Sequence, residues 1–380
     1  MSRHCGIVVW TCALWSFTWV GSAQGQSNRV VSLRQAAGTR FQIGVGLNHA
    51  GLNEADQQLI QKQFSVLTPE NCMKPQATQP QEGQFRFAEA DQFVAFARAN
   101  GQQIVGHCLV WAKDDRTPEW MTREGDGLVS AETLLKRMEA HIEAVVSRYA
   151  DAVSEWDVVN EAIADSGDQV LRDSAFSRTC GEHFILRAFQ VAKKCDPTAT
   201  FIYNDYNTHS PDKRGRMVKL LKSLKAQGTP VDVLGMQGHF ELGDNSVKEL
   251  RDTFEVLRRM NVKVVVSELD IDVIPRGRWW ADNGKHREEL SQLNPYRDGC
   301  PQYILEQQAS QYKALFQLFV DYDDIITRVS FWNLHDGASW LNDFPWKRSN
   351  YPLLFDRDRQ PKPSFAAVMK VLRPAQTEKD

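Results

Sequence analysis

The sequence predicts one α/β domain, a single (β/α)8 TIM barrel with long loops at the C-terminal face of its strands. From Phe41 onward, short apolar segments alternate with amphipathic segments of helical period, a pattern typical of a parallel sheet covered by helices. Eight such pairs occupy ~330 residues, which suits one barrel with long loops. A chain of 380 residues is long enough for two domains, but no Pro/Gly/Ser-rich linker divides it.

The expected strands are short apolar runs, of which the Val264-Val265-Val266 segment is the clearest. In chain order they are Phe41–Asn48, Ser65–Glu70, Gln103–Val110, Ser154–Asn160, Thr200–Asn204, Val233–Gly238, Lys263–Leu269 and Thr327–Trp332. The expected helices lie near residues 53–64, 89–100, 130–150, 180–195, 210–228, 245–260, 302–321 and 363–372. A doubly wound sheet is the rival, but His49 stands where a phosphate-binding glycine turn would place its third glycine.

The first 26 residues have the pattern of a secretory signal. Arg3 and His4 precede an apolar run over 6–20, which is shorter than the ~20 residues of a membrane span, and small residues follow over 21–23. We therefore expect residues 1–26 to be removed, residues 27–380 to form the barrel domain, and the mature protein to be secreted or periplasmic. An uncleaved membrane anchor is the alternative.

The composition excludes several classes of function. Lys and Arg number 45 and Asp and Glu 48, so a net charge of −3 provides no field for nucleic acid. Export makes disulfides possible, yet five cysteines follow the leader, an odd number without a regular framework: Cys72, Cys108, Cys180, Cys195 and Cys300. At least one thiol is therefore free or paired between chains, and stability should come from a large core.

Polar and aromatic residues gather where the expected strands end, which is where the chemistry of a barrel of this kind lies. They are Glu70 and Asn71, His107 and Trp111, Asn160 and Glu161, Asn204, Asp205 and Tyr206, Gln237 and His239, Glu268 and Asp270, and Trp332. Such residues beside otherwise apolar strands predict an active site at this mouth.

Three chemistries are compatible with such a mouth. Metal-assisted hydrolysis has potential ligands in His107, His209, His239, Asp205 and Asp270, but no HxH, HExxH or acidic cluster at ligand spacing. Acyl transfer has thiols at Cys72 and Cys108 but no GxSxG turn, and buried packing explains both. We therefore expect neither a metal nor another cofactor.

Glycoside hydrolysis needs two carboxylates that flank the bond to be broken. Glu161 and Glu268 end the fourth and seventh strands, and a retaining mechanism requires them ~5–5.5 Å apart. Sugar faces stack on indole rings, which Trp111, Trp332 and Trp340 supply. Side chains that donate hydrogen bonds to hydroxyls are Asn71, Lys74, Asn160 and Gln237.

At these residues the chain resembles the glycoside hydrolase family 10 endo-β-1,4-xylanases, from about Arg34 to Leu372. The matching segments are ENCMKP (70–75), GHCLVW (106–111), WDVVNEAI (156–163), YNDYN (203–207), LGMQGH (234–239), SELDI (267–271), FWNLHDGASWL (331–341) and YPLLFDRDRQPKPSF (351–365). The resemblance implies the same barrel and hydrolysis of internal bonds of xylan or xylo-oligosaccharides by retaining double displacement.

Residue by residue, the resemblance implies that Glu161 is the acid/base and Glu268 the nucleophile, with His239 bridging Glu268 and Asp270. Asn160 would face the 2-hydroxyl of the sugar being cleaved. The −1 site would be lined by Lys74, His107, Trp111, Gln237, Trp332 and Trp340. Glu70 and Asn71 would bind the −2 sugar, and Tyr203 and Asn204 would lie toward the aglycone.

Two departures from the family pattern concern substrate binding. Pro75 follows Lys74 where the family commonly has Trp, and residues 112–114 read Ala-Lys-Asp where it has His-Ser-Gln. The usual glutamine contact toward −2 is therefore missing or replaced by Lys113 or Asp114. In the loop after the seventh strand, Trp279 and Trp280 either extend the aglycone cleft or cap the edge of the barrel.

The sequence thus predicts an exported endo-1,4-β-xylanase that acts as a monomer, without a nucleic-acid partner and without a membrane partner once the signal is cleaved. A retaining β-glucanase with the same two glutamates is the rival within the hydrolases. A xylan-binding module without catalysis is the rival of another class, disfavoured because both carboxylates are present.

Overall fold

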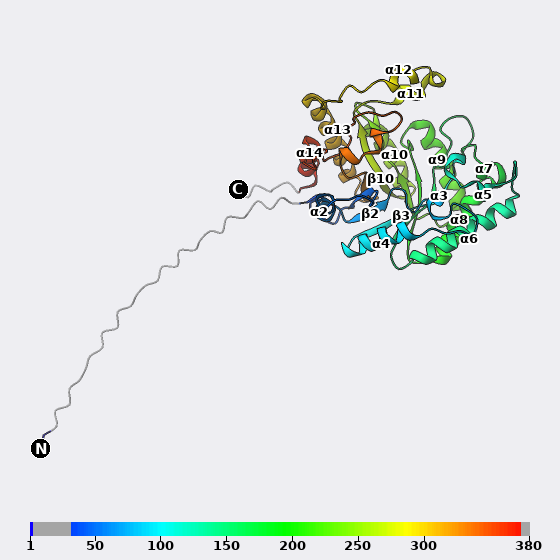
Figure 1. Ribbon diagram of the computed structural model, residues 1–380, viewed down its shortest axis with the longest axis horizontal. Helices are drawn as coiled ribbons and strands as arrows, with labels where there is room; N and C mark the ends of the chain where they lie inside the picture. Colours follow the sequence, from blue (N-terminus) through cyan, green and yellow to red (C-terminus); the bar gives the residue numbers. More distant parts are fainter. Residues whose placement is uncertain (3–31, 374–380) are drawn as a thin grey trace. The chain divides into compact units, whose positions relative to one another are not determined.

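The computed structural model describes residues 1–2 and 32–373 of the chain, and its centre is a closed barrel of eight parallel strands (Figure 1). Its strands are β1 (Gln42–Leu47), β2 (Val66–Pro69), β3 (Gln103–Trp111), β6 (Glu155–Asn160), β7 (Thr200–Asp205), β8 (Val233–Met236), β10 (Lys263–Asp272) and β11 (Ile326–Trp332). They pair in chain order, and β10 pairs with β11 and β11 with β1, which closes the barrel. The predicted fold is confirmed.

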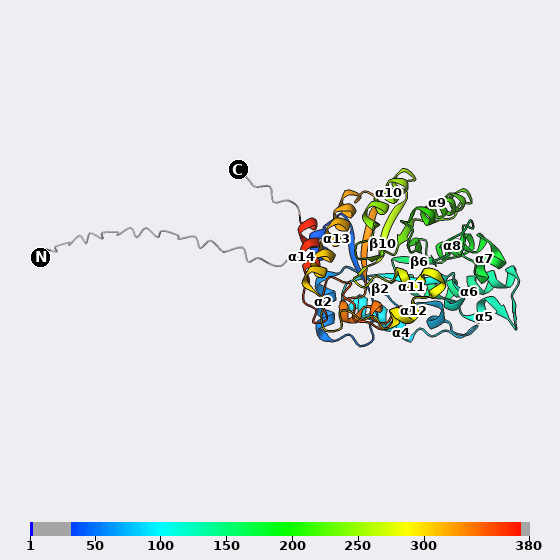
Figure 2. The same cartoon turned by 90° about the horizontal axis from the view of Figure 1, so that it is seen from above.

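Each barrel strand is followed by a long helix, and these helices surround the strands (Figures 1 and 2). They are α2 (Glu54–Gln63), α4 (Ala88–Ala99), α6 (Ala131–Tyr149), α8 (His183–Cys195), α9 (Pro211–Ala226), α10 (Ser246–Arg259), α13 (Gln302–Asp321) and α14 (Pro363–Leu372). Local sequence sets their starts: Asn53 caps α2 in a capping box with Asp56, and a proline opens α9 and α14. Each predicted helix is present at nearly its predicted position.

The loops add short elements, most of them at the C-terminal ends of the strands. The short helices are α1 (Leu33–Ala37), α3 (Pro75–Thr78), α5 (Glu119–Thr122), α7 (Ala175–Cys180), α11 (Gly277–Trp280) and α12 (Arg287–Ser291), with 3-10 turns at Asp114–Arg116, Ala281–Gly284, Asp336–Ala338 and Trp340–Asn342. Short strands are β4 (Arg123–Glu124), β5 (Gly127–Leu128) and β9 (His239–Glu241). Of these, β9 matters most, because it pairs with the end of β10 and sets His239 beside Asp270.

Two glycines in the barrel make room for side chains of the polar mouth. A Cβ on Gly46 of β1 would lie 2.5 Å from the indole of Trp332 on β11. A Cβ on Gly235 of β8 would lie 2.4 Å from Oδ1 of Asn204 on β7. Real Cβ atoms do not come that close to other heavy atoms, so any larger residue would displace Trp332 or Asn204.

The cysteines pack the structure rather than link it. All five that follow the predicted leader are free thiols, and Cys72 and Cys108 are buried, as expected. Burial raises the pKa of Cys72 to about 12, which makes it a poor nucleophile. The predicted signal segment, residues 1–26, lies outside the described residues apart from its first two. Within residues 32–373, no helix has both the length and the apolar character needed to cross a bilayer.

Candidate active site

A cleft of about 740 Å³ opens at the C-terminal ends of the strands. Its lining includes eleven of the predicted site residues: Glu70, Lys74, His107, Trp111, Asn160, Glu161, Gln237, His239, Glu268, Trp332 and Trp340. They come from six of the eight barrel strands and the segments that follow them. The expectation that the strand ends form one site is therefore met in the geometry.

Glu268 is held in place by hydrogen bonds to both carboxylate oxygens. Asn204 Nδ2 donates to Oε1 at 2.8 Å, and His239 Nε2 lies 3.2 Å from Oε2. Burial alone would raise the pKa of Glu268, but the hydrogen bond from His239, the nearby charge of His107 and the bond from Asn204 keep it below its ordinary value. Glu268 is therefore an ionised carboxylate that lines the cleft.

His239 bridges the two carboxylates as predicted. Its Nδ1 lies 3.0 Å from Oδ2 of Asp270, which is fully buried and also accepts a hydrogen bond of 2.7 Å from the indole of Trp340. Burial would lower the pKa of His239, but the charges of Asp270 and Glu268 and the hydrogen bonds to them outweigh it and raise the pKa to about 9. The imidazolium is thus a fixed cation behind Glu268.

Glu161 has an unusual backbone conformation. Its φ is 59°, in the left-handed region that costs a non-glycine residue ~1–2 kcal/mol. Two hydrogen bonds hold the backbone in this conformation. The N–H of Glu161 donates to the carbonyl of Asn204 at 2.9 Å, and Arg172 Nε donates to the carbonyl of Glu161 at 3.0 Å. This turn brings the side chain into the cleft, and backbone strain of this kind is concentrated at functional sites.

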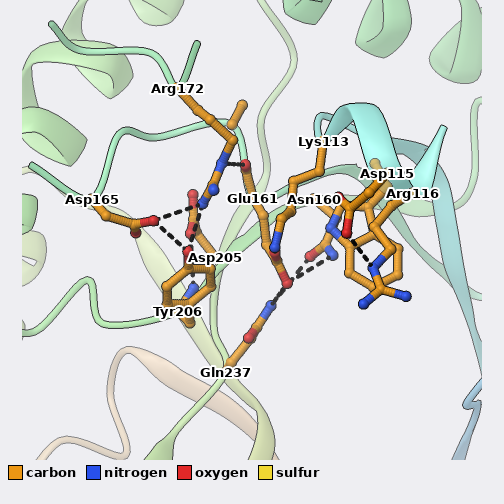
Figure 3. A network of polar contacts seen from close by, with 12 residues as sticks. Lys113, Asp115, Arg116, Asn160, Glu161, Asp165, Arg172, Asp205, Tyr206 and Gln237 are labelled. Atoms are coloured by element: carbon orange, nitrogen blue, oxygen red, sulfur yellow. Dashed lines mark hydrogen bonds and ion pairs between the residues drawn. The ribbon is translucent and has the colours of Figure 1, made fainter. Parts of the chain in front are cut away.

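The Glu161 carboxylate has weaker partners than Glu268. Gln237 Nε2 donates to Oε1 at 3.0 Å, Asn160 Nδ2 donates to the same oxygen at 3.4 Å, and Lys113 Nζ lies 3.8 Å from Oε2. Figure 3 shows these three side chains converging on Glu161. An amide chain also joins the two glutamates, because Asn204 donates to Asn160 Oδ1 at 3.0 Å.

Tyr203 and Asn204 do not occupy the predicted aglycone position. Both lie on β7 and are fully buried and outside the cleft lining. The Tyr203 hydroxyl donates to Asp205 at 2.8 Å and accepts from the N–H of Ala162, so it supports the Glu161 turn from behind. Their prediction as substrate-binding residues is corrected: Asn204 holds the Glu268 carboxylate, and Tyr203 supports the backbone beside Glu161.

Three further predicted residues, Asn71, Glu70 and His107, each have a polar side chain of the protein as a partner. Asn71 is exposed and outside the cleft lining, and its Oδ1 accepts from Lys74 at 3.0 Å. Glu70 lines the cleft and accepts from Asn333 at 3.0 Å. His107 is held by Asp157, 2.8 Å away and buried inside the barrel, a partner that the sequence reasoning missed although it lies in the WDVVN segment.

A second group of cleft residues was not among those to which the sequence analysis gave a binding role. Tyr206 accepts from Arg172 and donates to Asp165, both at 2.6 Å (Figure 3). Lys213 Nζ lies 2.8 Å from Asp165 and 2.9 Å from Asp205. Tyr206, Arg172, Asp165 and Lys213 all line the cleft. Only Tyr206 had a signal in the sequence, at the end of the fifth strand. The others lie in a loop and a helix, where charged residues usually face solvent.

The two tryptophans of the loop after β10 have different roles. Trp279 packs beside a buried cluster and stacks on Trp346, with ring centroids 5.2 Å apart. Trp280 is half exposed, lines the cleft and lies beside Phe344, which in turn stacks on Trp340. Of the two alternatives, capping the edge of the barrel suits Trp279, which packs against the buried cluster, whereas Trp280 extends the cleft.

Of the two departures from the family pattern, Pro75 and residues 112–114, only the second places a side chain in the cleft. Pro75 is buried and opens α3, so it does not reach the cleft. Asp114 turns away from the cleft and accepts from the N–H of Ala175 and from Arg178. Lys113 alone of this pair lines the cleft, and it reaches Glu161. Within the described part of the chain, no group of three or more His, Cys, Asp and Glu side chains is placed to hold a metal ion.

Comparison with known proteins agrees with this geometry. The model of the family described as glycosyl hydrolase family 10 matches residues 32–371. The endo-1,4-beta-xylanase B of Paenibacillus barcinonensis is 37% identical over 346 residues, which cover 90% of this chain and 99% of that protein. The endo-1,4-beta-xylanase of Geobacillus stearothermophilus is 37% identical over 344 residues, again 90% and 99%.

Solved structures give the same picture. A GH10 endoxylanase retrieved from sugarcane soil metagenome superimposes with a TM-score of 0.82 at 36% identity, covering 90% of this chain and 100% of that one. The xylanase XynB of Paenibacillus barcinonensis, complexed with a conduramine derivative, has a TM-score of 0.81 at 36% identity over 90% and 99% of the two chains.

Proposed function

The chain belongs to glycosyl hydrolase family 10, and we propose that it is an endo-1,4-β-xylanase that cleaves internal bonds of xylan with retention of configuration. The observation that carries the proposal is the pair of glutamates in one cleft with unequal surroundings. Glu268 is ionised and held at both oxygens, whereas Glu161 is held mainly at one. A retaining glycosidase needs one fixed nucleophile and one carboxyl that exchanges protons.

In the first step, Glu268 attacks the anomeric carbon while Glu161 donates its proton to the glycosidic oxygen. The C–O bond to the leaving sugar breaks, and a glycosyl ester forms on Glu268. In the second step, Glu161 takes a proton from water, the resulting oxygen nucleophile attacks the anomeric carbon, and Glu268 leaves as a carboxylate. His239 and Asn204 hold Glu268 in position throughout.

Trp340 supports the choice of xylose over glucose. Its indole lies beside His239, with ring centroids 4.9 Å apart, and is fixed by its hydrogen bond to Asp270. A rigid indole over the sugar site would crowd the C5 hydroxymethyl group of glucose, which xylose lacks. The relatives named above are endo-1,4-beta-xylanases, which agrees with this preference.

The deciding experiment is incubation of the purified protein with xylan, with cellulose and with mixed-linkage β-glucan, followed by analysis of reducing ends and products. We expect rapid release of a range of xylo-oligosaccharides. Hydrolysis of the glucans alone would make the protein a β-glucanase, and binding to xylan without new reducing ends would make it a binding module. An α-anomer seen first by NMR would contradict retention.

We also propose that the protein is exported and acts as a monomer. Export is supported by the signal pattern of residues 1–26. Expression in a secreting bacterial host should yield, outside the cytoplasm, a protein whose N-terminal residue lies near position 27. Retention of the complete N-terminus in the membrane fraction would contradict cleavage. Light scattering of the purified protein should give the mass of one chain, and a dimer mass would contradict the monomer.

A further inference from the structure

The cleft has a charge that a neutral polysaccharide does not need. Its lining contains six Lys and Arg residues against four Asp and Glu, although the whole chain has 45 against 48. The cations are Lys74, Lys113, Arg116, Arg172, Lys213 and Arg276. An excess of positive charge in a cleft raises the local concentration of anions.

Three of these cations already have carboxylate partners at ion-pairing distance. Arg172 and Lys213 both pair with Asp165, at 3.2 Å and 2.8 Å, and Arg276 pairs with the buried Asp272 at 2.7 Å. These pairs support the walls of the cleft and leave little charge for a ligand. A fourth cation, Lys74, lies beside Glu70 and Asn71, which the family pattern places at the −2 sugar.

Lys113 and Arg116 are the two cations with the weakest partners. Arg116 lies 3.4 Å from its neighbour Asp115, and both side chains are about half exposed, so the pair contributes little. Lys113 has Glu161 at 3.8 Å and no other ion-pair partner among residues 32–373. Glu161 must be neutral to donate its proton, and at that moment Lys113 has no protein anion beside it.

The loop that carries these two cations is firmly held. The Thr117 hydroxyl donates to the carbonyl of Trp111 at 2.7 Å and lies 2.9 Å from that of Lys113. Asp114 anchors the same turn to the start of α7. Lys113 is therefore presented to the cleft by a fixed backbone, which reduces the entropy that it would lose on binding a ligand.

We propose that Lys113 and Arg116 bind the carboxylate of a uronic acid side group carried by xylan, on a sugar next to the bond that is cleaved. The proposal rests on the function proposed above and names its substrate class: acidic xylan in preference to neutral xylan. The position follows from Glu161, because Lys113 lies beside the group that protonates the glycosidic oxygen. A carboxylate there replaces the anion that Lys113 loses when Glu161 is protonated.

The test compares two polymers that differ only in charge: glucuronoxylan, and the same glucuronoxylan after its carboxyl groups are reduced to alcohols. The measured quantity is the ratio of kcat/KM on the native polymer to that on the reduced polymer. We expect a ratio well above one for the wild type, and a decrease of about three- to fivefold for Lys113→Met or Arg116→Met, as for exposed ion pairs. Lys113→Arg should retain most of the ratio.

Arg259→Met is the control, since this exposed cation lies on α10 outside the cleft lining and should leave the ratio unchanged. A wild-type ratio near one, or an unchanged ratio in a variant that combines Lys113→Met and Arg116→Met, would overturn the proposal. Equal loss on both polymers would make Lys113 a positioning residue for Glu161 instead. Failure of the wild type on both polymers would refute the xylanase function itself, which is a different result.

Discussion

The two walls of the cleft hold their glutamates in different ways. On one wall, Glu268 accepts hydrogen bonds at both oxygens, and next to it His239, Asp270 and Trp340 form a hydrogen-bonded chain. On the other wall, Glu161 has one good amide donor, a second at 3.4 Å and a lysine at the limit of ion pairing.

This difference agrees with the different tasks that we propose for the two groups. A nucleophile keeps one charge state until it is esterified, so a fixed imidazolium beside it stabilises the form that reacts. An acid/base changes its protonation twice in each turnover, and a strong cationic partner would hold it in one state. Glu161 agrees with this requirement. Its backbone is fixed by hydrogen bonds from both sides, whereas its carboxylate has only one short hydrogen bond and a distant lysine.

The largest effect should follow from removing the nucleophile. Glu268→Gln should lower kcat on xylan by on the order of 10⁵-fold or more, the scale seen when a nucleophile is removed from other enzymes. Glu241→Gln, on β9 outside the cleft lining, is the matched control and should stay active. A 2-fluoro xylobioside with a good leaving group should label Glu268 of the wild type. A label on any other residue would refute the assignment.

Removing the acid/base should have an effect that depends on the substrate. Glu161→Ala should lower kcat/KM on xylan by roughly 10²–10⁴-fold, because its leaving group needs a proton. A dinitrophenyl xylobioside needs none, so its kcat/KM should change little while its kcat decreases. Azide should restore kcat and yield a β-xylosyl azide. Equal losses on both substrates without azide rescue would make Glu161 a binding or structural residue.

The charge of His239, beside Glu268, can be tested by measuring how the stability of the protein depends on pH. Its pKa is raised from 6.5 to about 9 in the folded protein, so its contribution to stability is complete below pH ~6.5 and is lost as the pH rises through 9. Urea unfolding should show wild type more stable than His239→Gln by a few kcal/mol at pH 6, and the difference should shrink by pH 9.5. A difference independent of pH would contradict the imidazolium.

The smallest of these effects concerns the choice of sugar. The wild type should prefer aryl xylobiosides to cellobiosides, and Trp340→Ala should narrow that preference by roughly 10-fold, since one steric contact is worth ~1–3 kcal/mol. Trp340→Phe loses the hydrogen bond to Asp270 but keeps an aromatic ring, so most of the preference should remain. An unchanged ratio in Trp340→Ala would remove this residue from sugar selection.

Much of the site could be predicted from the sequence because the motifs are attached to strand ends. A residue in or just after the C-terminal half of a strand of a parallel barrel lies near the C-terminal face whatever the loops do, which is why Glu161, Glu268 and Trp332 are where they were expected. The errors concern side chains that bind protein groups instead of the open cleft. Tyr203 hydrogen-bonds to Asp205 and Ala162, and Asn204 to Glu268 and Asn160, so both are buried.

The sequence by itself determined the barrel, its eight strand–helix pairs and the placement of Glu161 and Glu268 at its mouth, because periodicity and motif order are local properties of the chain. Only the tertiary structure decided which cations of the cleft are paired with carboxylates and that Lys113 reaches Glu161 while Asp114 turns to α7. It also decided that Trp279 packs against a buried cluster while Trp280 lines the cleft. These outcomes depend on contacts between segments far apart in sequence. The orientation of a loop side chain is set by the partners that the fold brings to it.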